Sequence, residues 1–416
     1  MIAKIKKMAV KKNFFSKYPL QFWFLMLGSL VFSTGGSLAW PFLSIYLQNK
    51  LDIPLRYSTL LISIRAFSGV IASFFFAGSF ADRFGRRILI LASLFGGILY
   101  YIGLDISKVM WQFALLMAFW GMLDIFYPVG INAMVADIIP SENRLEAYSL
   151  LRIVYNTGYG IGPIIGGIMA AQSYHTICVV AGIGYAISFV FMLFSIKETL
   201  PESAKSKKMK VDVASLLVAF KDKQFILSVF LMGIIYISSA GVFNLLSFYA
   251  SENFGFPESQ MSYVFTVNAA MCVFLQLWVI RKVEHIRPLK LMYTAGFIYF
   301  IGTIGNSLVD SVPWYCLCMA VITIGELIMT PTMSQLTADF APVDARGRYM
   351  SILSLAKPFG QGVGPAILGY VYDMIAPRMM WVVGSVFALI AGIAFYIMDR
   401  KIGNSDKLKP VNRETV

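Results

Sequence analysis

Runs of about twenty apolar residues, separated by short charged or Pro/Gly-rich breaks, recur along nearly the whole chain. A helix needs about 20 apolar residues to cross a hydrocarbon layer about 30 Å thick, so each run is a candidate membrane span. The sequence therefore predicts an all-α membrane protein with twelve transmembrane helices. The predicted spans lie near residues 20–48, 58–80, 88–106, 111–135, 145–171, 177–196, 225–249, 259–280, 291–308, 313–336, 347–374 and 379–398.

The composition excludes most other classes of protein. Of 416 residues, 58% are hydrophobic and only 14% are charged, whereas soluble domains carry about 25% charged residues. The four cysteines lie inside apolar runs, where thiols behave as small hydrophobic groups, so no disulfide framework is expected. No cluster of metal ligands, nucleophile with a base or nucleotide-binding motif is visible, so we expect neither a cofactor nor an enzyme.

The distribution of positive charge predicts the orientation. The longest polar interruption, residues 197–223, separates six spans from six, which predicts an N-terminal bundle (1–196), a central loop (197–224) and a C-terminal bundle with its tail (225–416). With the N-terminal tail in the cytoplasm, about 28 of the 35 Lys and Arg lie on the cytoplasmic side. This bias predicts a plasma-membrane protein with both termini cytoplasmic, and it explains the net charge of +13 without a nucleic acid partner.

The two halves of the chain repeat each other. A duplicated six-span unit is typical of transporters whose site lies between pseudo-symmetric bundles. Near the first spans, the segment 43–46 recurs at an offset of 203 residues as 246–249. The residues Asp137, Pro140, Arg144, Gly158, Gly162, Pro163 and Gly167 recur at an offset of 202 as Asp339, Pro342, Arg346, Gly360, Gly364, Pro365 and Gly369.

Two acids occupy equivalent positions deep in the predicted spans. The offset of 202 places Asp124 on Glu326, and each is the only acid deep in its span. A carboxylate inside a membrane is costly and generally faces a cavity or a partner, so we predict that both acids couple proton movement to transport. The alternative is a buried ion pair or a hydrogen-bonded structural acid. Arg65, in the second span, is either a counter-ion for Asp124 or a ligand for an anionic group of the substrate.

Three motifs resemble the major facilitator superfamily. The loop 78–87, Gly-Ser-Phe-Ala-Asp-Arg-Phe-Gly-Arg-Arg, is similar to the signature loop of that superfamily, whose fold is two bundles of six helices. The segment Gly158-x-x-x-Gly162-Pro163-x-x-Gly166-Gly167 looks like the motif of its drug:proton antiporters, and Gly325-Glu326-x-x-x-Thr330-Pro331 is similar to a segment of small bacterial multidrug antiporters. One departure is that Met117 and Trp120 stand where many relatives carry the arginine and glutamine that precede Gly121.

The resemblance implies roles for the loop and for the glycines. In the family, the loop latches the cytoplasmic side, and Asp137 is the expected partner for one of its arginines; the simpler interpretation is a turn flanked by arginines that set the topology. The latch residues are Gly78, Asp82, Arg83, Gly85, Arg86 and Asp137. The residues expected to pack helices closely or to let them bend are Gly158, Gly162, Pro163, Gly166, Gly167, Gly360, Gly364 and Pro365.

Aromatic residues at mid-span depth complete the predicted site. Such rings could line an apolar cavity that attracts lipophilic cations through cation–π contacts, although aromatic rings face lipid just as often. The residues concerned are Trp40, Trp120, Phe126, Tyr127, Tyr236 and Phe243.

The function predicted from all these features is proton-coupled export of amphipathic, cationic small molecules. The expected partners are the small-molecule substrate, protons and the lipid bilayer, with the protein as a monomer. The alternatives are a dedicated transporter of one solute (a sugar, peptide, lysolipid or organic anion) and a receptor or scaffold that does not transport.

Overall fold

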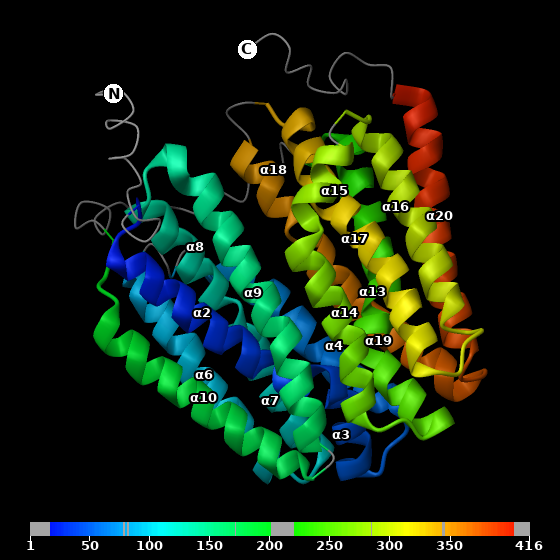
Figure 1. The fold of residues 1–416 in the computed structure, drawn as a ribbon, viewed down its shortest axis with the longest axis horizontal. Coiled ribbons are helices and arrows are strands. Elements are labelled where there is room, and N and C mark those ends of the chain that lie inside the picture. Colours follow the sequence, from blue (N-terminus) through cyan, green and yellow to red (C-terminus); the bar gives the residue numbers. More distant parts are fainter. Residues whose placement is uncertain are drawn as a thin grey trace, which may run out of the picture.

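The computed structural model describes residues 17–77, 80, 83–170, 172–200, 220–283, 285–342 and 346–402, and the regular structure in these ranges is helical throughout. The helices form two groups, one from each half of the sequence (Figure 1). The first half contains α2 (Leu20–Ala39), η2 (Trp40–Phe42), α3 (Leu43–Leu51), α4 (Leu55–Ala72), the π-helical η3 (Ser73–Ala77), α6 (Arg86–Ile106), α7 (Met110–Asp124), α8 (Phe126–Ile138), α9 (Ser141–Ala170) and α10 (Tyr174–Ser195). The second half contains α13 (Lys223–Phe254), α14 (Glu258–Phe274), α15 (Gln276–Val283), α16 (Pro288–Gly305), α17 (Val312–Phe340), α18 (Arg346–Leu353), α19 (Ala356–Met374) and α20 (Met379–Ile402).

Length and apolarity support most of the predicted spans. Within the described ranges, eight helical stretches are long and apolar enough to cross a membrane, and a ninth is α14 with α15, which bend by 58° relative to each other. The predicted spans that correspond to α9, α16 and α18–α19 do not pass the same test, so the full count of twelve stays a prediction.

Large apolar side chains on the outer surface agree with a membrane environment. Phe194, Phe274 and Leu308 are each at least 78% exposed. Exposed apolar surface on this scale is rare in soluble monomers, because water disfavours it, but it suits contact with lipid chains.

Each half has its own apolar core. One cluster of buried side chains extends from Tyr18 to Ile196, and the other takes most of its members from residues 225–398. The second cluster also includes Phe42, Ile45 and Leu55 from the first half, so the two cores meet where η2, α3 and the start of α4 contact α13 and its neighbours.

The halves meet mainly along two pairs of helices. Helix α9 packs on α14, and α4 packs on α19. In Figure 1 the two groups approach each other around α3 and α4 and diverge toward α8 and α18. We call the end that carries α3 the α3 end, and the opposite end, where α2 begins, the α8 end.

Candidate functional site

Arg65 and Asp124 form an ion pair inside the first half. Arg65 lies on α4 and Asp124 is the last residue of α7, and the distance from Arg65 Nη2 to Asp124 Oδ2 is 2.8 Å. Their side chains are 23% and 33% exposed, so the pair is partly accessible. The structure therefore shows the contact expected of a counter-ion, and the alternative role of Arg65 as a ligand for a substrate anion stays a prediction.

Sequence features around Asp124 explain why the pair forms there. Pro128 lacks a backbone N–H, and its ring clashes with the carbonyl of the residue four positions earlier, which is Asp124. The helix accordingly breaks at Ile125 between α7 and α8. Gly121, one turn before Asp124, lets the backbones of α7 and α4 touch, because a Cβ atom at this position would lie 2.1 Å from the carbonyl oxygen of Arg65.

Glu326 lies in the second half beside a neutral partner. Asn268, on α14, donates from Nδ2 to Oε2 of Glu326 at 2.9 Å and to the hydroxyl of Thr323 at 2.9 Å. Thr323 and Glu326 are neighbours on one face of α17, since they are three residues apart. Glu326 is only partly buried.

These two arrangements are related by the internal repeat. The offset of 203 residues that relates the first spans carries Arg65 onto Asn268, and the offset of 202 carries Asp124 onto Glu326. Each acid thus has a hydrogen-bond donor on the equivalent neighbouring helix, a guanidinium in one half and an amide in the other. Asn268 was missed in the sequence analysis, although the offset of 203 would have identified it.

The end of the loop before α6 contacts α8 and the residues that follow α10. Arg86 Nε donates to Asp137 Oδ2 at 3.1 Å, which is a contact that the sequence predicts. Glu198, which the sequence analysis did not single out, accepts from the backbone N–H groups of Arg86 (3.0 Å) and Arg87 (3.1 Å) at the start of α6. Gly85 has a φ of 102°, and its missing side chain leaves room for the Glu198 carboxylate.

The rest of the predicted latch is placed only in part. Arg83 lies on the surface with its guanidinium over the ring of Phe84. Gly78 and Asp82 lie outside the described residues. The role of this loop as a latch of the cytoplasmic side stays a prediction.

The glycine motifs bring helices into close contact. A Cβ atom at Gly158, Gly162 or Gly166 would lie within about 2 Å of an atom of α2. Gly360 and Gly364 contact α13 in the same way in the second half. Pro163 and Pro365 lie within unbroken stretches of α9 and α19, so close packing is observed, whereas bending at these prolines stays a prediction.

Two of the small-residue contacts join the halves. Gly167 on α9 approaches the backbone of Glu258 and Ser259, where a Cβ atom would lie 2.7 Å from the carbonyl oxygen of Glu258. Gly369 on α19 approaches Thr59 on α4, where a Cβ atom would lie 2.3 Å from the hydroxyl oxygen. The repeated glycines therefore allow close packing in both helix pairs that connect the two bundles.

Four of the predicted aromatic residues are buried, three of them in the first half and one in the second. Trp120 is 2% exposed and stacks on Tyr100, and Tyr127 is fully buried and stacks on Phe32 at 3.8 Å between ring centroids. These contacts place both rings in the core of the first half, so in this structure neither lines a space between the halves. Phe126 and Tyr236 are also buried, at 8% and 7% exposure.

Trp40 and Phe243 do lie at the junction of the halves. Their rings are nearly parallel, with centroids 5.9 Å apart. Trp40 donates from Nε1 to Oδ1 of Asn244 at 3.0 Å, and Asn244 in turn donates to Oε1 of Gln361 at 3.0 Å. This network joins η2, α13 and α19, and neither Asn244 nor Gln361 was identified from the sequence.

Further hydrogen bonds between the halves gather toward the α3 end. The backbone N–H of Arg56, near the start of α4, donates to Oδ2 of Asp373, near the end of α19, at 2.8 Å. The hydroxyl of Tyr174, at the start of α10, donates to Oε1 of Glu258, at the start of α14, at 2.7 Å. In this structure, hydrogen bonds therefore join the two halves at the α3 end, which we call the bonded α3 end.

Comparison with known proteins agrees with this architecture. A family model described as Major Facilitator Superfamily matches residues 25–343 and 305–413. The chain is 23% identical over 379 residues to the uncharacterised MFS-type transporter YqjV of Bacillus subtilis, covering 89% of this chain and 90% of that protein. It is 26% identical over 388 residues to the multidrug resistance protein MdtG of Salmonella heidelberg, covering 89% and 91%. Its fold is similar to a solved peptide transporter POT in complex with sulfate, with a TM-score of 0.79, 15% identity and coverage of 96% and 97%.

Proposed function

The chain belongs to the Major Facilitator Superfamily of membrane transporters, and from that premise we propose that it exports amphipathic, cationic small molecules in exchange for protons. The similarity to a relative named as a multidrug resistance protein supports this substrate class. The proposal depends most on one observation: the repeat places a carboxylate in each half, and the two carboxylates have partners of different charge.

The difference between the partners suggests how the two acids divide the work. Protonation of Asp124 would break an ion pair and leave the Arg65 guanidinium without its counter-charge, which is costly in a membrane protein. Protonation of Glu326 would leave the hydrogen bond from Asn268 intact, because a carbonyl oxygen also accepts. We therefore assign proton exchange to Glu326 and a structural, charge-balancing role to the Arg65–Asp124 pair.

Competition for Glu326 would couple export to proton entry. A cationic substrate favours the ionised carboxylate, whereas an entering proton neutralises it and releases the cation. Alternating access would come from rocking the two bundles about the α9–α14 and α4–α19 contacts, where small residues let the helices slide.

The orientation follows from the charge distribution, as part of the same proposal. The excess of Lys and Arg outside the predicted spans supports a cytoplasmic α8 end in a plasma-membrane protein, and we propose that the chain acts as a monomer. In this assignment the bonded α3 end faces outward.

Uptake of a fluorescent lipophilic cation into everted membrane vesicles tests the proposal. We expect wild-type protein to drive uptake when a proton gradient is imposed, and Glu326→Gln to abolish the gradient-dependent part, since an amide cannot exchange a proton. Asp124→Asn is expected to slow uptake without removing its dependence on the gradient. Asp310→Asn, in the exposed connection between α16 and α17, is the matched control and should transport like wild type.

Two results would contradict the proposal. Gradient-driven uptake that survives in Glu326→Gln would move the coupling role to Asp124. No uptake by folded wild-type protein would exclude a broad cation exporter and favour a dedicated transporter of one solute, with Arg65→Gln as the next variant to test.

A further inference from the structure

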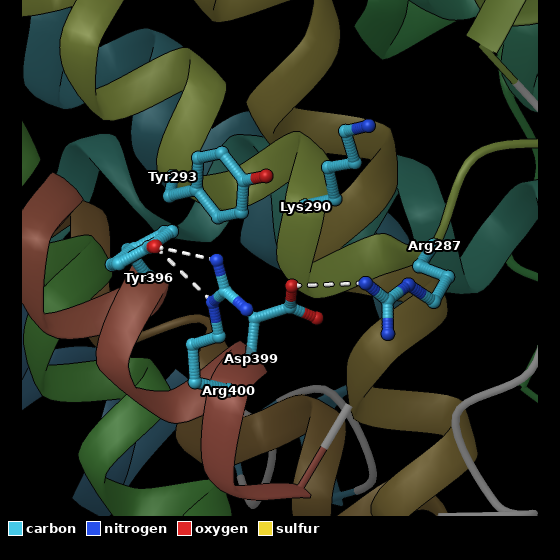
Figure 2. A pocket seen from close by; sticks show the side chains of 6 residues that line it. All are labelled: Arg287, Lys290, Tyr293, Tyr396, Asp399 and Arg400. Atoms are coloured by element: carbon cyan, nitrogen blue, oxygen red, sulfur yellow. Dashed lines mark hydrogen bonds and ion pairs between the residues drawn. The ribbon is translucent and has the colours of Figure 1, made fainter. Parts of the chain in front are cut away.

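A basic pocket lies at the α8 end of the second half, outside the two acid sites. It has a volume of about 300 Å³ and is formed by side chains from α16 and α20 together with Arg287, the residue that precedes α16 (Figure 2). Its lining residues are Arg287, Lys290, Tyr293, Tyr396, Asp399 and Arg400. None of these residues has a part in the transport mechanism proposed above.

The pocket carries an excess of positive charge held in a defined geometry. Arg400 donates from Nε (3.1 Å) and Nη2 (2.9 Å) to the hydroxyl of Tyr396, which fixes its guanidinium at the pocket. Arg287 Nη2 pairs with Oδ2 of Asp399 at 3.2 Å. With Lys290, the lining holds three cations and one carboxylate, so the pocket favours a ligand with a negative charge.

Asp399 is the least accessible charged group of the pocket. Its side chain is only 6% exposed, whereas Lys290 and Arg400 are exposed. A ligand that enters the pocket therefore meets mainly positive charge.

An apolar strip leads from the pocket along the outside of α20. Val386, Ile390, Ile393 and Ile397 follow one another at intervals of three or four residues, and all four side chains are more than 40% exposed. Arg400 continues the same interval, so the strip and the pocket share one face of the helix. An acyl chain lying on this strip would bring its headgroup to Arg400.

We propose that this pocket binds the headgroup of an anionic phospholipid, with phosphatidylglycerol as the simplest example. Lys290 and Arg400 bind the phosphodiester. Basic pockets between helices at a membrane surface are suited to anionic headgroups. An amine headgroup fits less well, because it would add a positive charge beside three cations.

Native mass spectrometry of the full-length protein in detergent, titrated with phosphatidylglycerol or phosphatidylcholine, tests the proposal. Phosphatidylcholine has the same phosphate but no net charge, so we expect wild-type protein to retain phosphatidylglycerol in preference. The double variant Lys290→Gln/Arg400→Gln should bind phosphatidylglycerol roughly 30-fold more weakly, since each basic residue near a membrane surface strengthens binding of an anionic lipid roughly fivefold.

The double variant Arg281→Gln/Lys282→Gln is the matched control. It removes the same charge from exposed positions on α15, outside the pocket, and should retain phosphatidylglycerol like wild type. Equal retention of the two lipids by wild type, or equal losses in the two double variants, would overturn the proposal. Thermal stabilisation of wild type by inorganic phosphate, absent in Lys290→Gln/Arg400→Gln and without any preference for phosphatidylglycerol, would identify a free-phosphate site instead.

Discussion

At the scale of single residues, the two acids differ in the charge of their hydrogen-bond partners. The Arg65–Asp124 pair is neutral as a whole, whereas Glu326 beside Asn268 keeps its full negative charge when it is ionised. In the proposed mechanism this difference of one charge decides which acid attracts a cationic substrate: the cation would be drawn to Glu326, while the Arg65–Asp124 pair would act as a fixed dipole.

Arg65→Gln tests whether Asp124 depends on its counter-ion. Loss of one partner of a buried pair costs about 3–5 kcal/mol; the two side chains here are partly exposed, so we expect about 1–3 kcal/mol. The double variant Arg65→Gln/Asp124→Asn removes both charges and should recover much of this stability. Thermal unfolding in detergent gives the double-mutant cycle, and additive losses in the double variant would show that the two side chains do not interact.

At the scale of helices, glycine positions decide how close two helices approach. Gly121 lets α7 touch the α4 carbonyl of Arg65, whereas Gly184 on α10 has open space where a Cβ atom would be. Gly121→Ala therefore has to separate α4 from α7 and stretch the Arg65–Asp124 pair. We expect a loss of about 1–3 kcal/mol, as for overpacked sites.

Gly184→Ala is the control for Gly121→Ala, since it adds the same methyl group to a helix without a clash. It should unfold at the wild-type temperature or above, because alanine is the better helix former. Equal effects of the two substitutions would mean that the close approach of α4 and α7 contributes nothing to stability.

The sequence could predict those elements of the site that depend on chain position alone. The repeat offset placed Asp124 and Glu326 in register, and Arg65 was correctly considered as a partner for Asp124 because both are isolated charges in apolar spans. The positions of Trp120 and Tyr127 could not be predicted, because in a membrane protein lipid, core and interface are all apolar, and hydropathy does not distinguish them. Glu198 was missed because its partners are backbone N–H groups, which leave no trace in the residue pattern.

At the scale of the whole molecule, the bonded α3 end defines one conformation of a transporter with two bundles. The Trp40–Asn244–Gln361 network and the hydrogen bond from Arg56 to Asp373 join the two halves at this end. For alternating access, these contacts must cost little to break, because a population that is locked in one state cannot transport. The apolar contacts of Phe42, Ile45 and Leu55 with the second half also have to open for this change.

Tyr174→Phe tests whether a hydrogen bond between the halves at the α3 end favours the closed state over the open one. The substitution removes the hydroxyl that donates to Glu258 across the two halves. A hydrogen bond to a charged group contributes about 1.5–3 kcal/mol, so its loss should shift the ratio of closed to open α3 ends by roughly tenfold or more. Distances between spin labels on the α3 ends of the two halves, measured by electron paramagnetic resonance, should move toward longer values.

Tyr372→Phe provides the matched control for Tyr174→Phe at the same end of the molecule. Tyr372 accepts a hydrogen bond from Nδ2 of Asn253 at 3.0 Å, and both residues belong to the second half. The control therefore removes the same hydroxyl group from a contact that does not cross between the halves, and its distance distribution should match wild type. If both substitutions leave the distribution unchanged, closure depends on helix packing at α9–α14 and α4–α19, and the hydrogen bonds serve only to align the halves. If both lengthen it equally, the effect comes from general loosening of the α3 end, and the contact between Tyr174 and Glu258 has no special part in gating.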